Sequence, residues 1–376
     1  MKVIVALDSF KGSLTSMEAC KLVEKGIKSK FKDIDVVKVP ISDGGEGFIE
    51  TIGGKKVYVT IKDPLYRDII SYYGIVNEKT ALIEMSLASG LTLLDINERN
   101  PLITSTYGTG QLILDALDKG IRDFIIGIGG SATNDAGVGM LMALGARFLD
   151  KDSKSIDLGG KALNNLAKID LDSLDERLHS SRVIVACDVE NTLYGKNGAS
   201  KVFAAQKGAT NKDIDILESA IINYANILDE KLNIKTNEIK GSGAAGGLGS
   251  ALIAVLNGCF KRGIDIVIEK NNLEEKIRSS DLVITGEGKI DYQTQFGKAP
   301  LGIARMAKKY GVPAIGICGT IGENIEKLYE EGFTSIFSII NKPMSLENAM
   351  KESEILLQNV SERIIRIYKD LYNKKA

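Results

Sequence analysis

Short runs of apolar residues recur along the chain and alternate with longer segments whose apolar residues follow a helical period. Most of the short runs are continuous in Val, Ile and Leu, which is typical of parallel strands covered on both faces. Helical segments between such strands indicate βαβ units and an α/β fold. The predicted strands are residues 3–7, 36–41, 124–128, 183–187, 264–268, 282–285, 314–318 and 335–340.

Three predicted helices carry start or stop signals. Thr15 and Glu18 form a capping box ahead of an apolar face. Gly120 follows a second apolar face, at residues 112–117, in the C′ position. Ser345 is predicted to cap a last helix, and the apolar stripe of this helix favours core packing. The stripe consists of Met350, Leu357, Val360, Ile364 and Ile367.

The segment around residues 68–85 breaks the βα pattern. Two strand-like runs, 68–76 and 81–85, are joined by residues 77–80 and predict a β-hairpin. A hairpin inside a βα chain indicates a second domain or a large insertion, and 376 residues suit about two domains. We place the boundaries near residues 62 and 275. Residues 1–62 and 275–376 then form one discontinuous α/β domain, and residues 63–274 form the second domain or insertion.

The composition indicates a globular protein without polyanionic or membrane partners. There are 48 Lys+Arg and 49 Asp+Glu residues, interspersed, so a nucleic acid partner is not favoured. No stretch approaches the roughly 20 apolar residues of a membrane-spanning helix, and the N-terminal apolar run is too short for a signal peptide. The 4 cysteines are far apart, which favours buried thiols. We expect a cytoplasmic protein. The sequence does not decide whether it forms a homo-oligomer.

Candidate chemistry lies in the segments that follow the predicted strands, where ligands bind in open α/β sheets. In residues 8–12, Asp8 and Ser9 precede Lys11, which would meet a phosphate or carboxylate as a point charge. A solvated loop is an equally good interpretation of this segment. Residues 42–47 hold three glycines and two acids. Backbone N–H groups at Gly44 and Gly45 would approach an anion, and Asp43 would hold Mg²⁺.

Two further loops combine glycines and hydroxyls at a predicted helix start. Residues 104–110, with Thr106 and Gly108, suit an anion site, although N-capping by Thr109 is commoner. Residues 129–137 give the strongest local signal, and Asp135 would bind a metal there. Helix capping by Thr133 or Asn134 explains this loop less well, since it leaves two glycines unused. The predicted phosphate-binding residues of the loop are Gly129, Gly130, Ser131 and Asn134.

Three later segments complete the candidate set. Asp188 ends the strand at 183–187, a good position for a general base or a metal ligand. The Gly/Ala-rich residues 241–249, including Gly243 and Gly246, leave room for a nucleotide or a hinge. The strand at 282–285 is followed by glycines, acids and lysines, among them Gly286, Glu287, Lys289 and Asp291.

Several enzyme classes are excluded or disfavoured. His179 is the only histidine, and its polar surroundings predict a surface position. A Ser-His-Asp triad is therefore disfavoured, and a multi-histidine metal site is excluded. The P-loop string, the protein-kinase motifs and the dinucleotide fingerprint after the first strand are missing. The remaining acids, lysines, hydroxyls and glycine loops are the groups that phosphoryl transfer needs.

Four of these segments, in this order and spacing, resemble the bacterial glycerate kinase family of the first type. They are residues 8–12, 42–47, 129–135 and 285–291, and the similarity runs from residue 1 to about residue 370. The resemblance implies phosphorylation of D-glycerate with ATP and Mg²⁺, generally to 2-phosphoglycerate, with the 3-phosphate as the other named product. It also implies a flavodoxin-like domain and an inserted domain, with the substrate between them.

Residue type and strand-end position suggest roles for these residues. Asp188 or Asp291 would accept the proton of the attacking hydroxyl. Asp43 and Asp135 would hold Mg²⁺ on the nucleotide, while residues 129–131 and 241–249 would line it. Lys11 and Lys289 would neutralise the transferring phosphate or the glycerate carboxylate.

Two other functions are weaker hypotheses. A hydroxy-acid dehydrogenase would share the α/β layout, but its dinucleotide fingerprint is missing. A non-catalytic nucleotide- or acid-binding protein would need fewer acids and lysines than this chain places at its strand ends.

Overall fold

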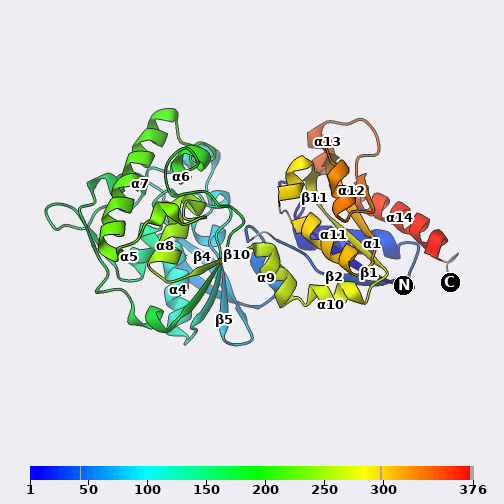
Figure 1. The fold of residues 1–376 in the computed structure, drawn as a ribbon, viewed down its shortest axis with the longest axis horizontal. Helices are drawn as coiled ribbons and strands as arrows, with labels where there is room; N and C mark the ends of the chain where they lie inside the picture. The colour runs from blue at the N-terminus through cyan, green and yellow to red at the C-terminus, as the bar shows by residue number, and fades with distance from the viewer. Residues whose placement is uncertain (43, 297–298, 373–376) are drawn as a thin grey trace. The chain divides into compact units, whose positions relative to one another are not determined.

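The computed structural model describes residues 1–42, 44–296 and 299–372, and the chain divides into two compact units (Figure 1). Unit 1 comprises Met1–Asp43, Glu50–Ile52 and Ile264–Ala376; unit 2 comprises Gly44–Ile49 and Gly53–Gly263. Both changes of unit come earlier than the boundaries near 62 and 275. Residues 55–62 form a strand that pairs within the sheet of unit 2, and residue 275 lies inside a helix of unit 1.

Unit 1 is built on a five-stranded parallel sheet in the order β13-β12-β11-β1-β2. In chain order this is 2-1-3-4-5, the arrangement of flavodoxin-like folds. The predicted apolar runs 3–7, 282–285 and 314–318 lie in β1, β11 and β12, and every residue of these runs is buried. The bounds are β1 (Lys2–Leu7), β2 (Asp35–Lys38), β11 (Leu282–Ile290), β12 (Ala314–Ile321) and β13 (Ser335–Ser338).

Helices cover both faces of this sheet. The crossovers from β1 to β2 and from β11 to β12 run in opposite directions along the sheet, so their right-handedness puts α1 and α11 on opposite faces. α1 lies beside α14 (Figure 1), and a Cβ on Gly26 would come within 2.3 Å of Gln358 O. The bounds are α1 (Ser16–Lys28), α9 (Gly263–Lys270), α10 (Leu273–Arg278), α11 (Ala299–Lys309), α12 (Glu326–Glu331), α13 (Leu346–Lys351) and α14 (Ser353–Tyr372).

Two predictions in unit 1 need correction. The run at 264–268 is the helix α9 and not a strand; Ile264, Ile266 and Val267 are buried, a pattern that does not alternate as in a half-buried strand. The segment after Ser345 is two helices: Ser345 caps the short α13, and α14 begins afresh at Ser353. The capping box of Thr15 and Glu18 is confirmed at the start of α1.

Unit 2 contains a six-stranded mixed sheet in the order β10-β9-β6-β5-β4-β3. The predicted hairpin is confirmed, because β4 and β5 pair antiparallel. Its turn places Asn77 and Glu78 at φ 51° and 57°, the left-handed conformation that tight hairpins favour. The sequence did not predict β3, an edge strand with alternating burial. The bounds are β3 (Lys55–Lys62), β4 (Asp68–Val76), β5 (Thr80–Glu84), β6 (Asp123–Gly127), β9 (Arg182–Ala186) and β10 (Cys259–Lys261).

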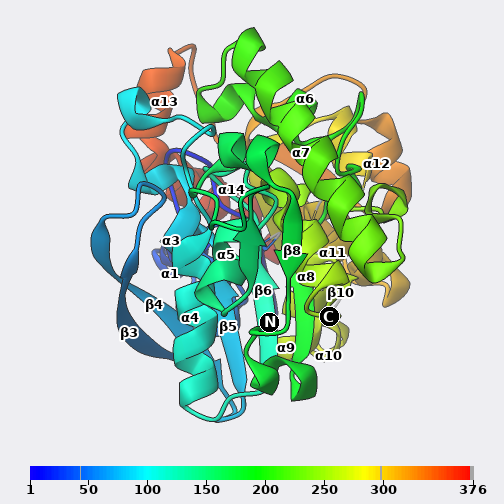
Figure 2. The same ribbon diagram turned by 90° about the vertical axis from the view of Figure 1, so that its left-hand side faces the viewer.

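One large apolar core holds unit 2 together. α4 packs along β3 and β5 (Figure 2), and α8 packs on β9. Gly120 ends α4 at φ 82°, as predicted. The bounds of the other elements are α2 (Phe48–Ile52), α3 (Ser86–Ser89), α4 (Tyr107–Asp118), α5 (Val138–Ala143), α6 (Ala199–Phe203), α7 (Asn211–Leu232), α8 (Leu248–Ala254), β7 (Arg147–Leu149) and β8 (Lys168–Asp170).

The predictions about membrane helices, His179 and the cysteines can be compared with the structure. Across residues 1–42, 44–296 and 299–372, no helix is both long enough and apolar enough to cross a bilayer. His179 is exposed, as predicted. All four cysteines are free thiols, but only Cys20 and Cys318 are buried, so the prediction of four buried thiols is wrong.

Candidate functional site

In unit 1, the loop after β1 and the end of β11 lie together at the point where the strand order reverses. Asp8 N–H donates to Gly286 O at 2.8 Å, and Ser9 N–H donates to Asp8 Oδ1 at 2.6 Å. A Cβ built on Gly288 would lie 3.6 Å from Phe10 Cα. Such a switch point is where open α/β sheets bind ligands. The structure thus brings the 8–12 and 286–291 segments together, as their sequence positions suggest.

Charged side chains at this end of unit 1 reach solvent. Lys11 is exposed, while Asp8 and Glu287 are half-buried. Lys289 Nζ lies 2.8 Å from Asp291 Oδ2, and the lysine side chain is 61% exposed while Asp291 is buried. The neighbouring carboxylate of Asp291 raises the pKa of Lys289, so this lysine is charged at neutral pH. Thr294 Oγ1 donates to Glu287 Oε1 at 3.3 Å.

In unit 2, Asp135 is fully buried and serves two helix starts. Its Oδ2 accepts hydrogen bonds from Thr106 N–H at 2.8 Å and Thr106 Oγ1 at 2.9 Å, at the first turn of α4. Gly137 N–H donates to its Oδ1 at 3.1 Å, and Gly139 N–H donates to its Oδ2 at 3.2 Å, at the start of α5. Burial raises the pKa of Asp135, and these donors oppose that effect.

This arrangement does not support the predicted magnesium role of Asp135. Both carboxylate oxygens are engaged by N–H and O–H donors inside the protein, and the side chain is 0% exposed. The anion at the N-terminus of α4 is therefore the protein's own carboxylate, which replaces the external anion predicted at Thr106. Thr109 does not cap α4 either; its Oγ1 lies 2.9 Å from Ser89 Oγ. Within the described residues, no group of three His, Cys, Asp or Glu side chains is placed to hold a metal.

The glycines at residues 44–45 pack against the carboxyl ends of β6 and β9. A Cβ on Gly127 would lie 2.4 Å from Gly44 O, and one on Gly129 would lie 2.5 Å from Gly45 Cα. Gly44 itself faces Ala186 at the end of β9, with a built Cβ only 2.9 Å from Ala186 Cβ. These glycines let two backbone segments approach closely, which explains them without a ligand. The predicted metal ligand Asp43 lies outside the described residues.

The buried carboxylate of Glu84 accepts hydrogen bonds from the backbone that follows residues 44–45. It is 1% exposed at the end of β5, and its Oε1 accepts from Gly47 N–H at 2.9 Å and from Ser86 Oγ at 3.1 Å. The other carboxylate oxygen accepts from Ile49 N–H at 3.3 Å. This acid is not among the predicted site residues, because a single Glu at the end of an apolar run matches no motif.

Three more predicted binding glycines are buried packing positions. A Cβ on Gly108 would lie 1.9 Å from Lys62 O, one on Gly243 1.9 Å from Thr192 O, and one on Gly246 2.0 Å from Thr133 O. Gly246 also accepts the N–H of Ala136 at 3.0 Å, which ties residues 241–249 to residues 129–137. The two loops are thus brought together as predicted, but these three glycines allow backbone contact inside the protein.

Some predicted residues of unit 2 remain accessible. Gly130 is exposed with φ 74°, and Gly129 is half-buried beside it. Asp188 is exposed just after β9, where its Oδ1 accepts from Gly263 N–H at 3.2 Å. Asn134 is buried and donates from Nδ2 to Ser200 Oγ at 3.1 Å. The reachable part of this strand end is therefore the 129–130 turn and the Asp188 carboxylate.

A buried lysine, which is not among the predicted site residues, contacts this turn. Lys207 is 2% exposed, and its Nζ donates to Ser131 Oγ and to Thr133 O, both at 2.6 Å. Burial lowers the pKa of Lys207 to about 7, and the charge of Asp135 opposes that shift. No sequence signal could have found it, because an Ala-Gln-Lys-Gly segment matches no binding motif.

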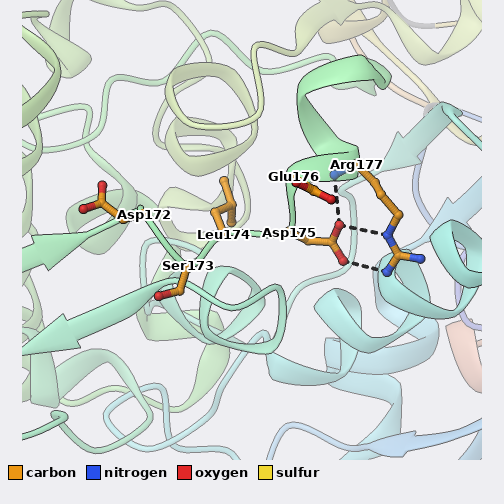
Figure 3. Close-up of a pocket in the computed structure, with 6 residues that line it drawn as sticks. All are labelled: Asp172, Ser173, Leu174, Asp175, Glu176 and Arg177. Atoms are coloured by element: carbon orange, nitrogen blue, oxygen red, sulfur yellow. Dashed lines mark hydrogen bonds and ion pairs between the residues drawn. The ribbon is translucent and has the colours of Figure 1, made fainter.

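A separate surface hollow of about 460 Å³ is lined by none of the predicted site residues (Figure 3). Its walls are the consecutive residues 172–177. Within it, Arg177 is paired with Asp175, with Nη2 to Oδ2 at 2.6 Å, and also with Asp118 at 2.8 Å. These ion pairs engage Arg177 and Asp175, and none of the predicted site residues lines the hollow, so it adds nothing to the candidate site.

The fold and the strand-end groups together define an α/β enzyme of two units rather than a P-loop or protein-kinase-like protein. The family model described as the glycerate kinase family matches residues 3–369. A glycerate kinase of Bacillus subtilis is 44% identical over 97% of this chain and 97% of its own length. A glycerate 2-kinase of Escherichia coli is 44% identical over 93% of each chain.

A crystal structure of a candidate glycerate kinase 2 from Salmonella typhimurium LT2 is also similar, with a TM-score of 0.85 and 42% identity over 99% of both chains. The chain therefore belongs to the glycerate kinase family. It is a kinase, a phosphotransferase whose acceptor is an alcohol group, and the resemblance drawn from the four sequence segments is confirmed.

Proposed function

We propose that the protein transfers a phosphoryl group from ATP to D-glycerate and that 2-phosphoglycerate is the main product. The observation that carries the proposal is the near-complete match to proteins named glycerate kinase, one of them named glycerate 2-kinase. The 3-phosphate product is the alternative regiochemistry. A cytoplasmic location is part of the same proposal.

In this proposal, the open end of unit 1 binds an anionic part of a substrate. Lys11 and Lys289 are exposed cations close to the switch point, which supports a role in neutralising phosphate or carboxylate charge. Asp8, Ser9, Gly286 and Glu287 belong to the same two segments and would shape that site. Gly286 acts through packing, because a Cβ there would lie 1.8 Å from Ile317 O.

Asp188 is the better of the two general-base candidates. A base must reach the proton of the attacking hydroxyl. Asp188 is exposed at the end of β9, whereas Asp291 is buried and paired with Lys289 at 2.8 Å. Asp291 stays the second candidate.

The nucleotide would be bound by the 129–131 turn of unit 2, where Gly130 is exposed and Ser131 lies beside a buried cation. Mg²⁺ is bound in kinases by one or two carboxylates together with the nucleotide phosphates. Asp135 does not fit this role, because its oxygens are engaged by helix N–H groups. Asp43 is the remaining proposed ligand. When bound, Mg²⁺ would neutralise charge on the transferring phosphate.

One coupled assay tests the proposal. ADP release is measured with ATP, Mg²⁺ and a panel of small hydroxy acids, and NMR of the product identifies the phosphorylated carbon. We expect turnover with D-glycerate and a 2-phosphate product. ADP release without glycerate dependence would refute the substrate assignment. Reduction of a nicotinamide cofactor by glycerate would favour the dehydrogenase hypothesis instead.

A further inference from the structure

Lys207 is the one buried lysine or arginine side chain in the part of the chain that the structure describes. It ends a short 3-10 helix (Ala205–Lys207) of unit 2, and its Nζ contacts Ser131 Oγ and Thr133 O at 2.6 Å each. Burying an ammonium group costs several kcal/mol unless an anion or several acceptors compensate it. Two neutral oxygens compensate it only in part, so packing alone does not explain a lysine at this position.

The contact decides how the hydroxyl of Ser131 is oriented. In its protonated form Lys207 only donates hydrogen bonds, so Ser131 Oγ then accepts from Lys207 and its own proton points elsewhere. Over residues 1–42, 44–296 and 299–372, Ser131 Oγ has no other hydrogen-bond partner. A hydroxyl that accepts from a cation is also a stronger donor. Ser131 therefore has a polarised hydroxyl that can donate a hydrogen bond to a ligand.

Among the described residues, no hydrogen bond takes up this proton of Ser131. Asp135, four residues further on, accepts instead from Thr106, Gly137 and Gly139. Gly130 immediately before Ser131 is exposed, so the turn reaches solvent. In the same loop, Thr133 Oγ1 and Asn134 Oδ1 are buried and have no partner among the described atoms. Buried polar groups are normally hydrogen-bonded, so these two atoms require a partner that the described atoms do not supply.

We propose that Lys207 is a positioning residue of this kinase, which holds the 129–133 turn and directs the Ser131 hydroxyl toward a substrate oxyanion. The inference rests on the proposed function and deepens it. The oxyanion is either a phosphate of the nucleotide or the carboxylate of glycerate, since both accept hydrogen bonds from a hydroxyl and a backbone turn in the same way. Lys207 lies behind Ser131 and acts through it.

The test compares Lys207→Met, Lys207→Arg, Ser131→Ala and the double variant Lys207→Met/Ser131→Ala. We expect Lys207→Met to raise the KM for one substrate about 10-fold, the effect of losing one charge-assisted hydrogen bond, with a smaller change in kcat. Ser131→Ala should have a similar effect. The double variant should be no worse than the stronger single variant, because both remove one contact. Lys207→Arg should recover part of the KM.

A matched control is Lys201→Met, because Lys201 is an exposed lysine paired with Asp215 at 2.6 Å in the same unit. Its kinetic constants should equal those of the native protein. A raised KM for ATP identifies the oxyanion as phosphate, and a raised KM for glycerate identifies the carboxylate. Native KM values in Ser131→Ala, or effects that multiply in the double variant, overturn the proposal even if Lys207→Met does not fold.

Calorimetric binding of ATP and of glycerate separates this inference from the proposed function. A native protein that binds a substrate but does not phosphorylate glycerate refutes the kinase substrate assignment alone. A Ser131→Ala variant that binds both substrates with native Kd overturns the role of Lys207 and Ser131, whatever the reaction is.

Discussion

The charged groups at the strand ends of unit 1 and unit 2 differ in what they contact. In unit 1, Lys11 and Lys289 are exposed, and Asp8 and Glu287 are half-buried. In unit 2, the acid with the strongest sequence signal, Asp135, is fully buried and bound to the N–H groups of two helices. Similar residue types after similar strands thus serve different purposes.

The difference shows that an acid beside glycines at a helix start has two uses that the sequence does not separate. A carboxylate satisfies the free N–H groups of a helix N-terminus as well as it binds a cation. Burial decides between them: Asp135 is 0% exposed and surrounded by donors, so it stabilises the loop. Among the predicted site residues of unit 2, Gly130 and Asp188 are exposed and Gly129 is half-buried.

The largest expected effect is on Asp135. Asp135→Ala should lower the free energy of unfolding by about 3–5 kcal/mol, because several buried donors lose their acceptor. Asp135→Asn should cost less, since one carbonyl oxygen remains. Urea denaturation measures both. The Mg²⁺ concentration for half-maximal activity should be unchanged in Asp135→Asn; a large increase would restore the metal role and remove the contrast between the units.

The next effect concerns catalysis at the exposed side of unit 2. Asp188→Asn should cut kcat by roughly 10²-fold or more if Asp188 is the general base, while the amide oxygen keeps the hydrogen bond from Gly263 N–H. Steady-state kinetics checks this against Glu190→Gln, an exposed neighbour paired with Lys240, which should behave as the native protein. Near-native kcat in Asp188→Asn together with a loss in Asp291→Asn would move the base to unit 1.

The sequence predicted the parts of the fold in which one physical signal dominates. Continuous apolar runs located the buried strands β1, β11 and β12, and turn residues located the β4–β5 hairpin. The edge strand β3 was missed because only one of its eight residues is buried. The strand prediction for residues 264–268 was wrong. Their β-branched side chains favour strands, whereas packing in unit 1 made the segment a helix.

The candidate site was less predictable than the fold. The segments that meet were found, since strand ends gather at one edge of a sheet. The function of single residues inside them was not, because Gly108, Gly243 and Gly246 look like ligand loops and are backbone contacts. The position of Lys207 could not be predicted for a related reason. Its burial and its contact with Ser131, 76 residues away in the sequence, arise only from the tertiary fold.

A third prediction uses the buried charge that distinguishes unit 2. The pKa of Lys207 is about 7 in the folded protein and 10.5 without the fold. Below pH 7 both states are protonated, so the cost of burying the charge is fully present. Between pH 7 and 10.5 the unfolded state binds more protons, and the stability contributed by Lys207 rises with pH.

Relative to Lys207→Met, the native protein should therefore gain about 2 kcal/mol in unfolding free energy between pH 7 and pH 9, at about 1.4 kcal/mol per unit of pH. Urea denaturation of both proteins at several pH values gives this difference. The carboxylate of Asp135 faces the same loop but is ionised in the unfolded state throughout this range, and it is present in both proteins. A difference that does not depend on pH would mean that Lys207 keeps an ordinary pKa.

The smallest expected effect separates packing glycines from accessible glycines within unit 1. Gly288 has no atom closer than 3.6 Å to a built Cβ, and its φ is not positive, so Gly288→Ala should change the unfolding free energy by less than about 1 kcal/mol. A Cβ built on Gly286, two residues earlier on β11, would lie 1.8 Å from Ile317 O. Gly286→Ala should therefore lower the unfolding free energy several-fold more than Gly288→Ala. If the open end of unit 1 holds a substrate anion close to the backbone, Gly288→Ala should raise a KM while leaving stability almost native. If that KM is native as well, the exposed lysines of unit 1 bind the substrate anion without help from the β11 backbone. The glycines of the two units then differ less in function than the charged residues do.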